Sequence, residues 1–176
     1  DDSLCWAAAA ANVLWWTGWG QSPGQGFADE DDVLAYFRDH WTNEGGRANY
    51  GLQWWFDGVN PSQGWSGISQ VDVPGGGFWE PPYDFDAVFE QTTDDAAALP
   101  RLEEYLRAGR GVALALARDW GHEVACWGFR TDDAGNYLGI YITDPDDDRI
   151  LPDPPDRLRY PNFASYGRKS FVCVVN

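Results

Sequence analysis

The sequence predicts an α+β domain in which helices come first and an antiparallel sheet second. Stretches before residue 107 are alanine runs or repeat their apolar residues at helical spacing, whereas later stretches alternate or are continuously apolar, as strands are. Elements segregated in this order are typical of the α+β class. The chain has 176 residues, 44% of them hydrophobic, so it can bury the core of a single domain spanning residues 1–176.

Four helices are expected in the first part of the chain. The first is an alanine-rich run that ends before Gly18, a residue type suited to a helix C-terminus. The second opens with an acidic run at residues 29–32, which complements the positive end of a helix dipole and is not interpreted as a metal site. The triplet at residues 75–77 is interpreted as a flexible turn. The expected helices cover residues 4–16, 33–41, 52–59 and 94–106.

Four strands are expected in the second part, over residues 111–117, 123–129, 137–143 and 170–175. The polar stretch TDDAGN at residues 131–136 is typical of a hairpin turn joining the second strand to the third. A hairpin brings the start of its first strand beside the end of its second. This register places His122 at the same end of the sheet as Asp144.

Charge and cysteine content narrow the classes of partner. The net charge of −16 repels phosphate backbones and anionic lipid, so neither nucleic acid nor a membrane surface is an expected partner. No apolar run is long enough to span a bilayer. Three cysteines without a C-x-x-C pair do not form a disulfide framework or a structural zinc site, although one Cys126–Cys173 disulfide stays open. Two histidines without close ligand spacing predict no metal and no cofactor.

Cys5 is the first candidate for chemistry, because it stands where the alanine-rich helix begins, with Asp2 or Ser3 available to cap it. The amides and the dipole at a helix N-terminus favour negative charge, and a thiolate is the nucleophilic form of cysteine. The alternative is a small buried thiol on a core helix, which is the usual environment of a free cysteine. The rest of the chain must therefore supply a base and an orienting acid.

His122 and Asp144 can supply both groups. His122 follows Trp120-Gly121 and enters a strand, and Asp144 ends the next strand. A base needs its second ring nitrogen held by an acceptor such as Asp144. The order of cysteine on an N-terminal helix, histidine at a strand start and an acid at the next strand end describes the papain-like arrangement. His40, late in the acidic helix, is expected to be an ordinary solvated histidine.

Four blocks match one known family. They are Asp1-Asp2-x-Leu4-Cys5 with Asn12-x-Leu14-x-Trp16, then Phe85-Asp86-Ala87-Val88-Phe89, then His122-x-Val124 with Trp127-Gly128, then Tyr141-Ile142-Thr143-Asp144-x-Asp146. By these blocks the chain resembles the IdeS-type immunoglobulin-degrading cysteine endopeptidases, which are papain-like, secreted bacterial enzymes. The similarity covers both ends of the catalytic unit and is thin over residues 21–82.

The resemblance implies a papain-like cysteine protease fold, with the nucleophile helix packed on the C-terminal antiparallel sheet. It implies Cys5 as the nucleophile, His122 as general base and later acid, and Asp144 as the residue that orients His122. Asp146 would be a second functional acid in the same loop, and it is the alternative to Asp144 as the acid of the triad. A solvated acidic turn or a calcium loop is the other interpretation there, although the spacing lacks the glycine and glutamate of an EF-hand. The reaction would be peptide-bond hydrolysis through a thioester acyl-enzyme, on immunoglobulin or another host protein outside the cell.

Other functions fit the same residues. A related acyl transferase or amidase would use the same triad, and a catalytically weak or silent papain-like module would bind a peptide or glycan in an aromatic cleft. The family's oxyanion side chain lies upstream of its cysteine, whereas only four residues precede Cys5 here. We therefore expect that the chain is N-terminally trimmed, as its first residue Asp1 also indicates, and that the second oxyanion donor lies upstream of Asp1.

Overall fold

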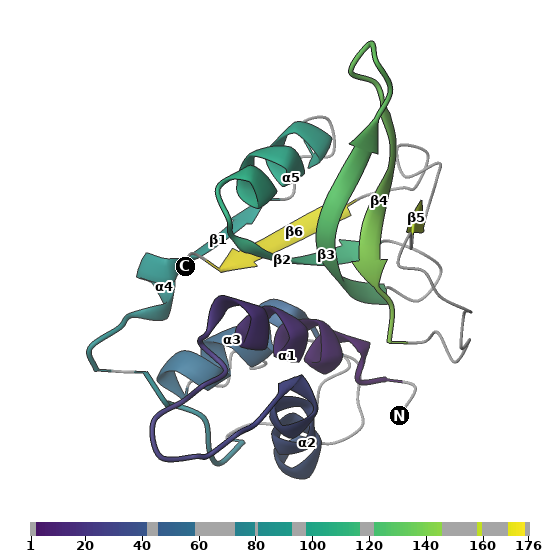
Figure 1. Ribbon diagram of the computed structural model, residues 1–176. Coiled ribbons are helices and arrows are strands. Elements are labelled where there is room, and N and C mark those ends of the chain that lie inside the picture. The colour runs from purple at the N-terminus through teal and green to yellow at the C-terminus, as the bar shows by residue number, and fades with distance from the viewer. Residues whose placement is uncertain are drawn as a thin grey trace.

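The computed structural model describes residues 3–41, 46–58, 73–79, 81–92, 98–116, 122–145, 158–159 and 169–174. An antiparallel sheet lies between two groups of helices, as the α+β prediction requires (Figure 1). The helices are α1 (Cys5–Thr17), α2 (Glu30–His40), α3 (Ala48–Asp57), α4 (Phe85–Val88) and α5 (Ala98–Arg107). The strands are β1 (Phe89–Thr92), β2 (Gly111–Leu116), β3 (His122–Thr131), β4 (Tyr137–Thr143), β5 (Leu158–Arg159) and β6 (Lys169–Val174).

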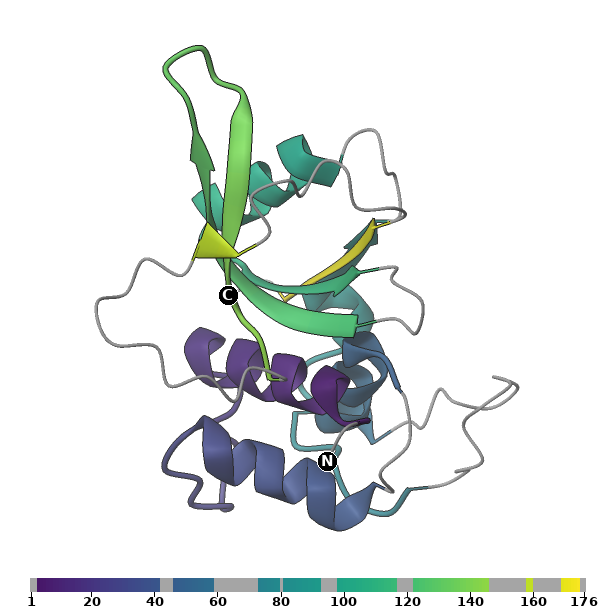
Figure 2. The same cartoon turned by 90° about the vertical axis from the view of Figure 1, so that its right-hand side faces the viewer.

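The sheet has the strand order β1-β6-β2-β3-β4-β5, and every neighbouring pair is antiparallel. The four predicted strands are present within one or two residues of their predicted ends. The predicted hairpin turn joins β3 to β4, where the Asp132 amide donates to the Asn136 carbonyl. Strands β1 and β5 at the two edges were not predicted. Figure 2 shows the β3–β4 hairpin curving away from the rest of the sheet.

Two hydrophobic cores fill the two sides of the sheet, because successive side chains of a strand point to opposite faces. Ala113 and Ala125 pack with α1, α2 and α3 on one face. Their neighbours Leu114, Val124 and Cys126 pack with α5 on the other. In Figure 1 the sheet lies between α5 above and α1 below, with α2 beneath α1.

Helix α1 approaches the sheet closely because the residues between them are small. All residues from Ala7 to Ala11 are buried. On the neighbouring strand β2, Gly111 has no side chain, and a Cβ there would lie only 2.8 Å from Val13 Cγ1 and 2.7 Å from Thr17 Cγ2. The helix ends at Gly18, whose φ of 85° is the left-handed conformation that glycine favours.

The acidic run at the start of α2 serves the helix N-terminus, as predicted. The Asp29 side chain accepts a hydrogen bond from the Asp32 amide at 3.1 Å, and the Asp32 side chain accepts one from the Ala28 amide at 2.8 Å. These reciprocal bonds satisfy amides at the helix start that have no partner within the helix.

The glycine triplet packs tightly instead of forming the flexible turn that the sequence suggested. The amides of Gly77, Phe78 and Trp79 donate to the carbonyls of Trp54, Trp55 and Phe56 at the end of α3. A Cβ at Gly76 would lie 2.1 Å from the Trp54 carbonyl oxygen, and the φ of Gly76 is +65°. The triplet therefore allows the backbone to cap the last turn of α3 at close range.

The open question of a Cys126–Cys173 disulfide is answered by the register of the sheet. Both cysteines lie opposite Val112, on the two strands that flank β2. Neighbouring strands are about 4.8 Å apart, so two strand spacings exceed the ~7 Å between Cα atoms that a disulfide can bridge. Cys126 is a free thiol.

None of the helices in the described part of the chain is long and apolar enough to cross a membrane.

Candidate active site

Cys5 is the first residue of α1. Leu4, and not Ser3, occupies the N-cap position, and its side chain makes no cap hydrogen bond. Asp2 lies outside the described residues. Instead, the Leu4 carbonyl accepts hydrogen bonds from the amides of Ala7 and Ala8, both at 3.0 Å. The thiol is half-buried and lies at the positive end of the helix dipole, where negative charge is favoured.

His122 is the first residue of β3, and Asp144 directly follows β4. Ala125 pairs with Thr143 across the two strands, so the start of β3 lies beside the end of β4. Nε2 of His122 is 2.8 Å from Oδ1 of Asp144, and both side chains are largely buried, with exposed fractions of 12% and 16%. The sequence argument had placed these residues at one end of the sheet, and the structure puts them in contact.

The ring of His122 also shares a side-chain hydrogen bond with Cys5. Because Asp144 holds Nε2, we assign the bond to Cys5 to the other ring nitrogen, Nδ1. The bond to Asp144 and then the bond to Cys5 raise the pKa of His122 to about 10, against the opposing effect of burial. At neutral pH the ring is therefore an imidazolium between a carboxylate and a thiol group, the charge state that suits a thiolate nucleophile.

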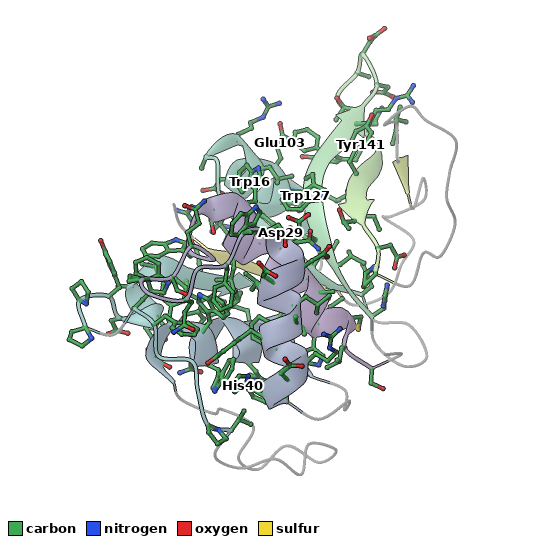
Figure 3. The ribbon with its side chains drawn as sticks, turned by 60° about the horizontal axis from the view of Figure 1, so that its bottom comes forward. Trp16, Asp29, His40, Glu103, Trp127 and Tyr141 are labelled. Carbon is green, nitrogen blue, oxygen red and sulfur yellow. The ribbon has the colours of Figure 1, made fainter. Side chains whose placement is uncertain are left out.

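A second contact fixes the end of β4. The indole Nε1 of Trp127 on β3 donates to the hydroxyl of Thr143 at 2.8 Å. Trp127 also packs against Trp16, with ring centroids 5.9 Å apart; Figure 3 shows these two residues beside each other. Because Thr143 immediately precedes Asp144, this hydrogen bond helps to fix the backbone that carries the Asp144 side chain. Sequence reasoning gave Trp127 no role at the site.

Glu123 was also missed by the sequence analysis. It is 6% exposed, one of the two buried polar residues in the described ranges, and one of its carboxylate oxygens accepts a hydrogen bond from the Ala48 amide at the start of α3. Burial raises the pKa of Glu123 to about 7, while the Ala48 amide and the charges of Arg47 and His122 oppose that shift. The available signal was a carboxylate within an otherwise apolar strand.

The remaining candidates lie elsewhere. Asp146, the expected second acid, lies outside the described residues. His40 belongs to an aromatic group: its Nδ1 is 2.8 Å from the Tyr36 carbonyl oxygen, and its ring lies 4.0 Å from the Tyr36 ring and 5.7 Å from that of Trp54. It is half-buried rather than fully solvated as expected.

No protein-family model matches this chain, and no curated protein matches it either. The function must therefore be argued from the site itself. Within the ranges that the structure describes, no three His, Cys, Asp or Glu side chains gather closely enough to hold a metal ion. What the site offers is a half-buried thiol at a helix N-terminus, a protonated imidazole in contact with it, and a carboxylate that holds the imidazole.

Proposed function

We propose that this chain is a cysteine peptidase with a papain-like fold and a Cys5-His122-Asp144 triad. The observation that carries the proposal is the pair of side-chain hydrogen bonds made by His122, one to Asp144 and one to Cys5. A buried core cysteine would have no reason to face a charged imidazole. The helix N-terminus adds a second favourable interaction for a thiolate.

The reaction follows from these positions. The Cys5 sulphur attacks the carbonyl carbon of a peptide bond, and the Cys5 backbone amide donates to the oxygen on which negative charge develops. The His122 imidazolium gives its proton to the leaving amine, and a thioester forms as the C–N bond breaks. His122, now neutral, takes a proton from water; the hydroxide attacks the thioester and releases the acid and the Cys5 thiolate. Asp144 holds the ring throughout.

A protein or peptide is the proposed substrate. The net charge of −16 opposes binding of nucleic acid and anionic membranes, and it favours polypeptides that are neutral or basic. The resemblance to IdeS-type enzymes motivates immunoglobulin, or another host protein met outside the cell, as the first substrate to test.

Thiol chemistry provides the first experiment. Iodoacetamide at neutral pH should alkylate Cys5 fast in the wild type and slowly in His122→Ala, with peptide mass spectrometry locating the label. Cys126→Ser serves as the control and should leave the labelling rate unchanged. Equal labelling of Cys5 in the wild type and in His122→Ala would contradict the proposal.

Product analysis separates the proposal from its alternatives. The wild type and Cys5→Ala should be incubated with immunoglobulin and with a panel of denatured proteins, with and without hydroxylamine as an acceptor. New N-termini that require Cys5 indicate a peptidase. Hydroxamate formed at side-chain or main-chain carbonyls without chain cleavage indicates an acyl transferase. Retained binding by both variants without either product indicates a binding module.

A further inference from the structure

The residue after His122 has a position that the proposed reaction does not explain. Glu123 is the second residue of β3, and it pairs with Ala115 of β2. Alternation puts it on the same face as Ala125, which packs against the helices α1 to α3. Its carboxylate therefore points from the strand of the base toward the layer that holds the nucleophile. A carboxylate at such a position carries a large desolvation cost unless it has a specific partner.

Its partner is the start of α3. The Ala48 amide, 75 residues earlier in the chain, donates to one of the carboxylate oxygens. Arg47 occupies the N-cap of α3 and makes no side-chain cap of its own. Glu123 thus acts as the cap of this helix from a distant strand, at the end where the dipole favours an anion.

The start of α3 is in turn packed against the residue that follows the nucleophile. A Cβ at Gly46 would lie 2.6 Å from the Trp6 ring, and one at Gly51 would lie 2.8 Å from it. Trp6 is 2% exposed and directly follows Cys5 in α1. The start of α3 therefore contacts the nucleophile helix through Trp6 and the base strand through Glu123.

We propose that Glu123 is a positioning residue, which ties the strand of His122 to the start of α3 and so sets the distance between the imidazole and the Cys5 thiol. The proposal rests on the proposed function in taking Cys5 and His122 as the reacting pair. The effect of Glu123 passes through two connections, the backbone to His122 and the hydrogen bond to Ala48.

Charge supports the same role. The groups that bear on the Glu123 carboxylate are the Ala48 amide, Arg47 and His122, which all lower its pKa against burial; on the paired strand the facing residue, Ala115, is apolar. Since the interaction between two charges is mutual, the ionised carboxylate must also favour the His122 imidazolium. Removing its charge should therefore shift the titration of His122 downward.

Two substitutions separate the hydrogen bond from the charge. Glu123→Gln keeps an acceptor oxygen for Ala48 and loses the charge, whereas Glu123→Ala loses both. Glu90→Gln is the control, because Glu90 accepts from Tyr105 and Arg110 on the far side of the sheet. A third variant, Ala48→Pro, removes the amide donor at the first position of α3, where proline is tolerated. If Ala48→Pro does not fold, Glu123→Gln still tests the proposal.

The readouts are kcat and KM on a cleaved peptide, normalised by titration of active Cys5, and the pH dependence of Cys5 alkylation. We expect Glu123→Ala to lower kcat by about 10- to 100-fold with little change in KM. Glu123→Gln should lower kcat less than Glu123→Ala does. Both Glu123 variants should move the alkaline limb of the alkylation profile to lower pH. Glu90→Gln should change neither quantity.

The outcomes distinguish the two proposals. If alkylation of Cys5 depends on His122 but both Glu123 variants keep the wild-type kcat and profile, Glu123 is not a positioning residue and the peptidase proposal stands. If alkylation does not depend on His122, the peptidase proposal fails first. A loss of active protein alone, with an unchanged profile and kcat per active site, would show that Glu123 only stabilises the fold and would also overturn the inference.

Discussion

Nε2 of His122 lies 2.8 Å from Oδ1 of Asp144, between the start of β3 and the end of β4. The hairpin between these strands brings together two residues 22 positions apart, and it leaves the opposite edge of the ring to the Cys5 thiol. The bond to Asp144 is the largest cause of the raised pKa of His122, ahead of the bond to Cys5. The carboxylate thus both orients the His122 ring and favours its charged form.

Replacing Asp144 should separate these two effects. Asp144→Asn keeps an acceptor for the Nε2 hydrogen and loses the charge, so we expect kcat/KM to fall by about 10- to 100-fold and the alkaline limb of the pH profile to move from about 10 toward 6.5. Asp144→Ala loses the acceptor as well and should lower kcat/KM further. Identical profiles for the wild type and Asp144→Asn would exclude Asp144 as the acid.

Folding stability should depend on pH through His122. Its pKa in the folded protein, about 10, is above its ordinary value of 6.5, so the folded state binds the proton more tightly than the unfolded state. This stabilisation is fully present below pH 6.5 and is lost as the pH rises to about 10. Urea unfolding between pH 6 and 10 should show the loss in the wild type and a smaller slope in His122→Ala.

The cysteines should differ sharply in reactivity. Burial raises the pKa of Cys126 to about 12, and its side chain is 0% exposed, so it should resist alkylation at neutral pH in the folded protein. Cys5 should react under the same conditions, and both should react in denaturant. Labelling of Cys126 at the rate of Cys5 in the native protein would mean that the hydrophobic core between α5 and the sheet opens readily.

The indole of Trp127 should contribute to stability through one hydrogen bond. Trp127→Phe keeps the aromatic ring but removes the donor to Thr143, and we expect a loss of about 1 kcal/mol. Thr143→Val removes the acceptor. Because the two side chains share one hydrogen bond, the double variant should lose less stability than the sum of the losses in the two single variants. Chemical denaturation of all four proteins measures this coupling. Additive losses would show that the two side chains act independently.

The glycine triplet offers a test of the close packing behind α3. In Gly76→Ala the new methyl group would meet the Trp54 carbonyl, so we expect a destabilisation of about 3 kcal/mol or more. Gly24→Ala is the matched control, because Gly24 has a similar φ of +82° with nothing within 4 Å of its Cβ position, and it should cost about 1 kcal/mol. Thermal unfolding of the two variants gives the comparison.

Local patterns were sufficient to predict most of the fold. Alternation and apolar runs predicted β2, β3, β4 and β6, and the TDDAGN turn predicted which two form a hairpin. Strand β1 was not predicted, because Phe89–Thr92 follows a helical turn and becomes a strand only by pairing with β6, some 80 residues later in the chain. The start of α3 was predicted four residues late, since its cap comes from Glu123 instead of a neighbour in sequence.

The residues of the site also fall into those that the sequence predicts and those that it does not. Cys5, His122 and Asp144 could be proposed because each stands at a recognisable end of a helix or strand, and the hairpin relates two of them. The partners that hold them could not be proposed, because the Ala48 amide and the Thr143 hydroxyl have no distinguishing residue type. Their roles depend on distances that only the packed sheet and helices define.

The alanine run of α1 makes the separation between this helix and the sheet part of the geometry that sets Cys5 against His122. Alanines of α1 share one core cluster with Ala113 and Ala125 of the sheet, and Gly111 meets Val13 and Thr17, so little room exists for an added carbon where the helix meets the sheet. Enlarging one of these alanines would therefore displace the whole helix, and with it the sulphur at its tip, relative to His122. Residues without any functional group, one or two turns from the thiol, can in this way set the distance between Cys5 and His122 on which the proposed reaction depends.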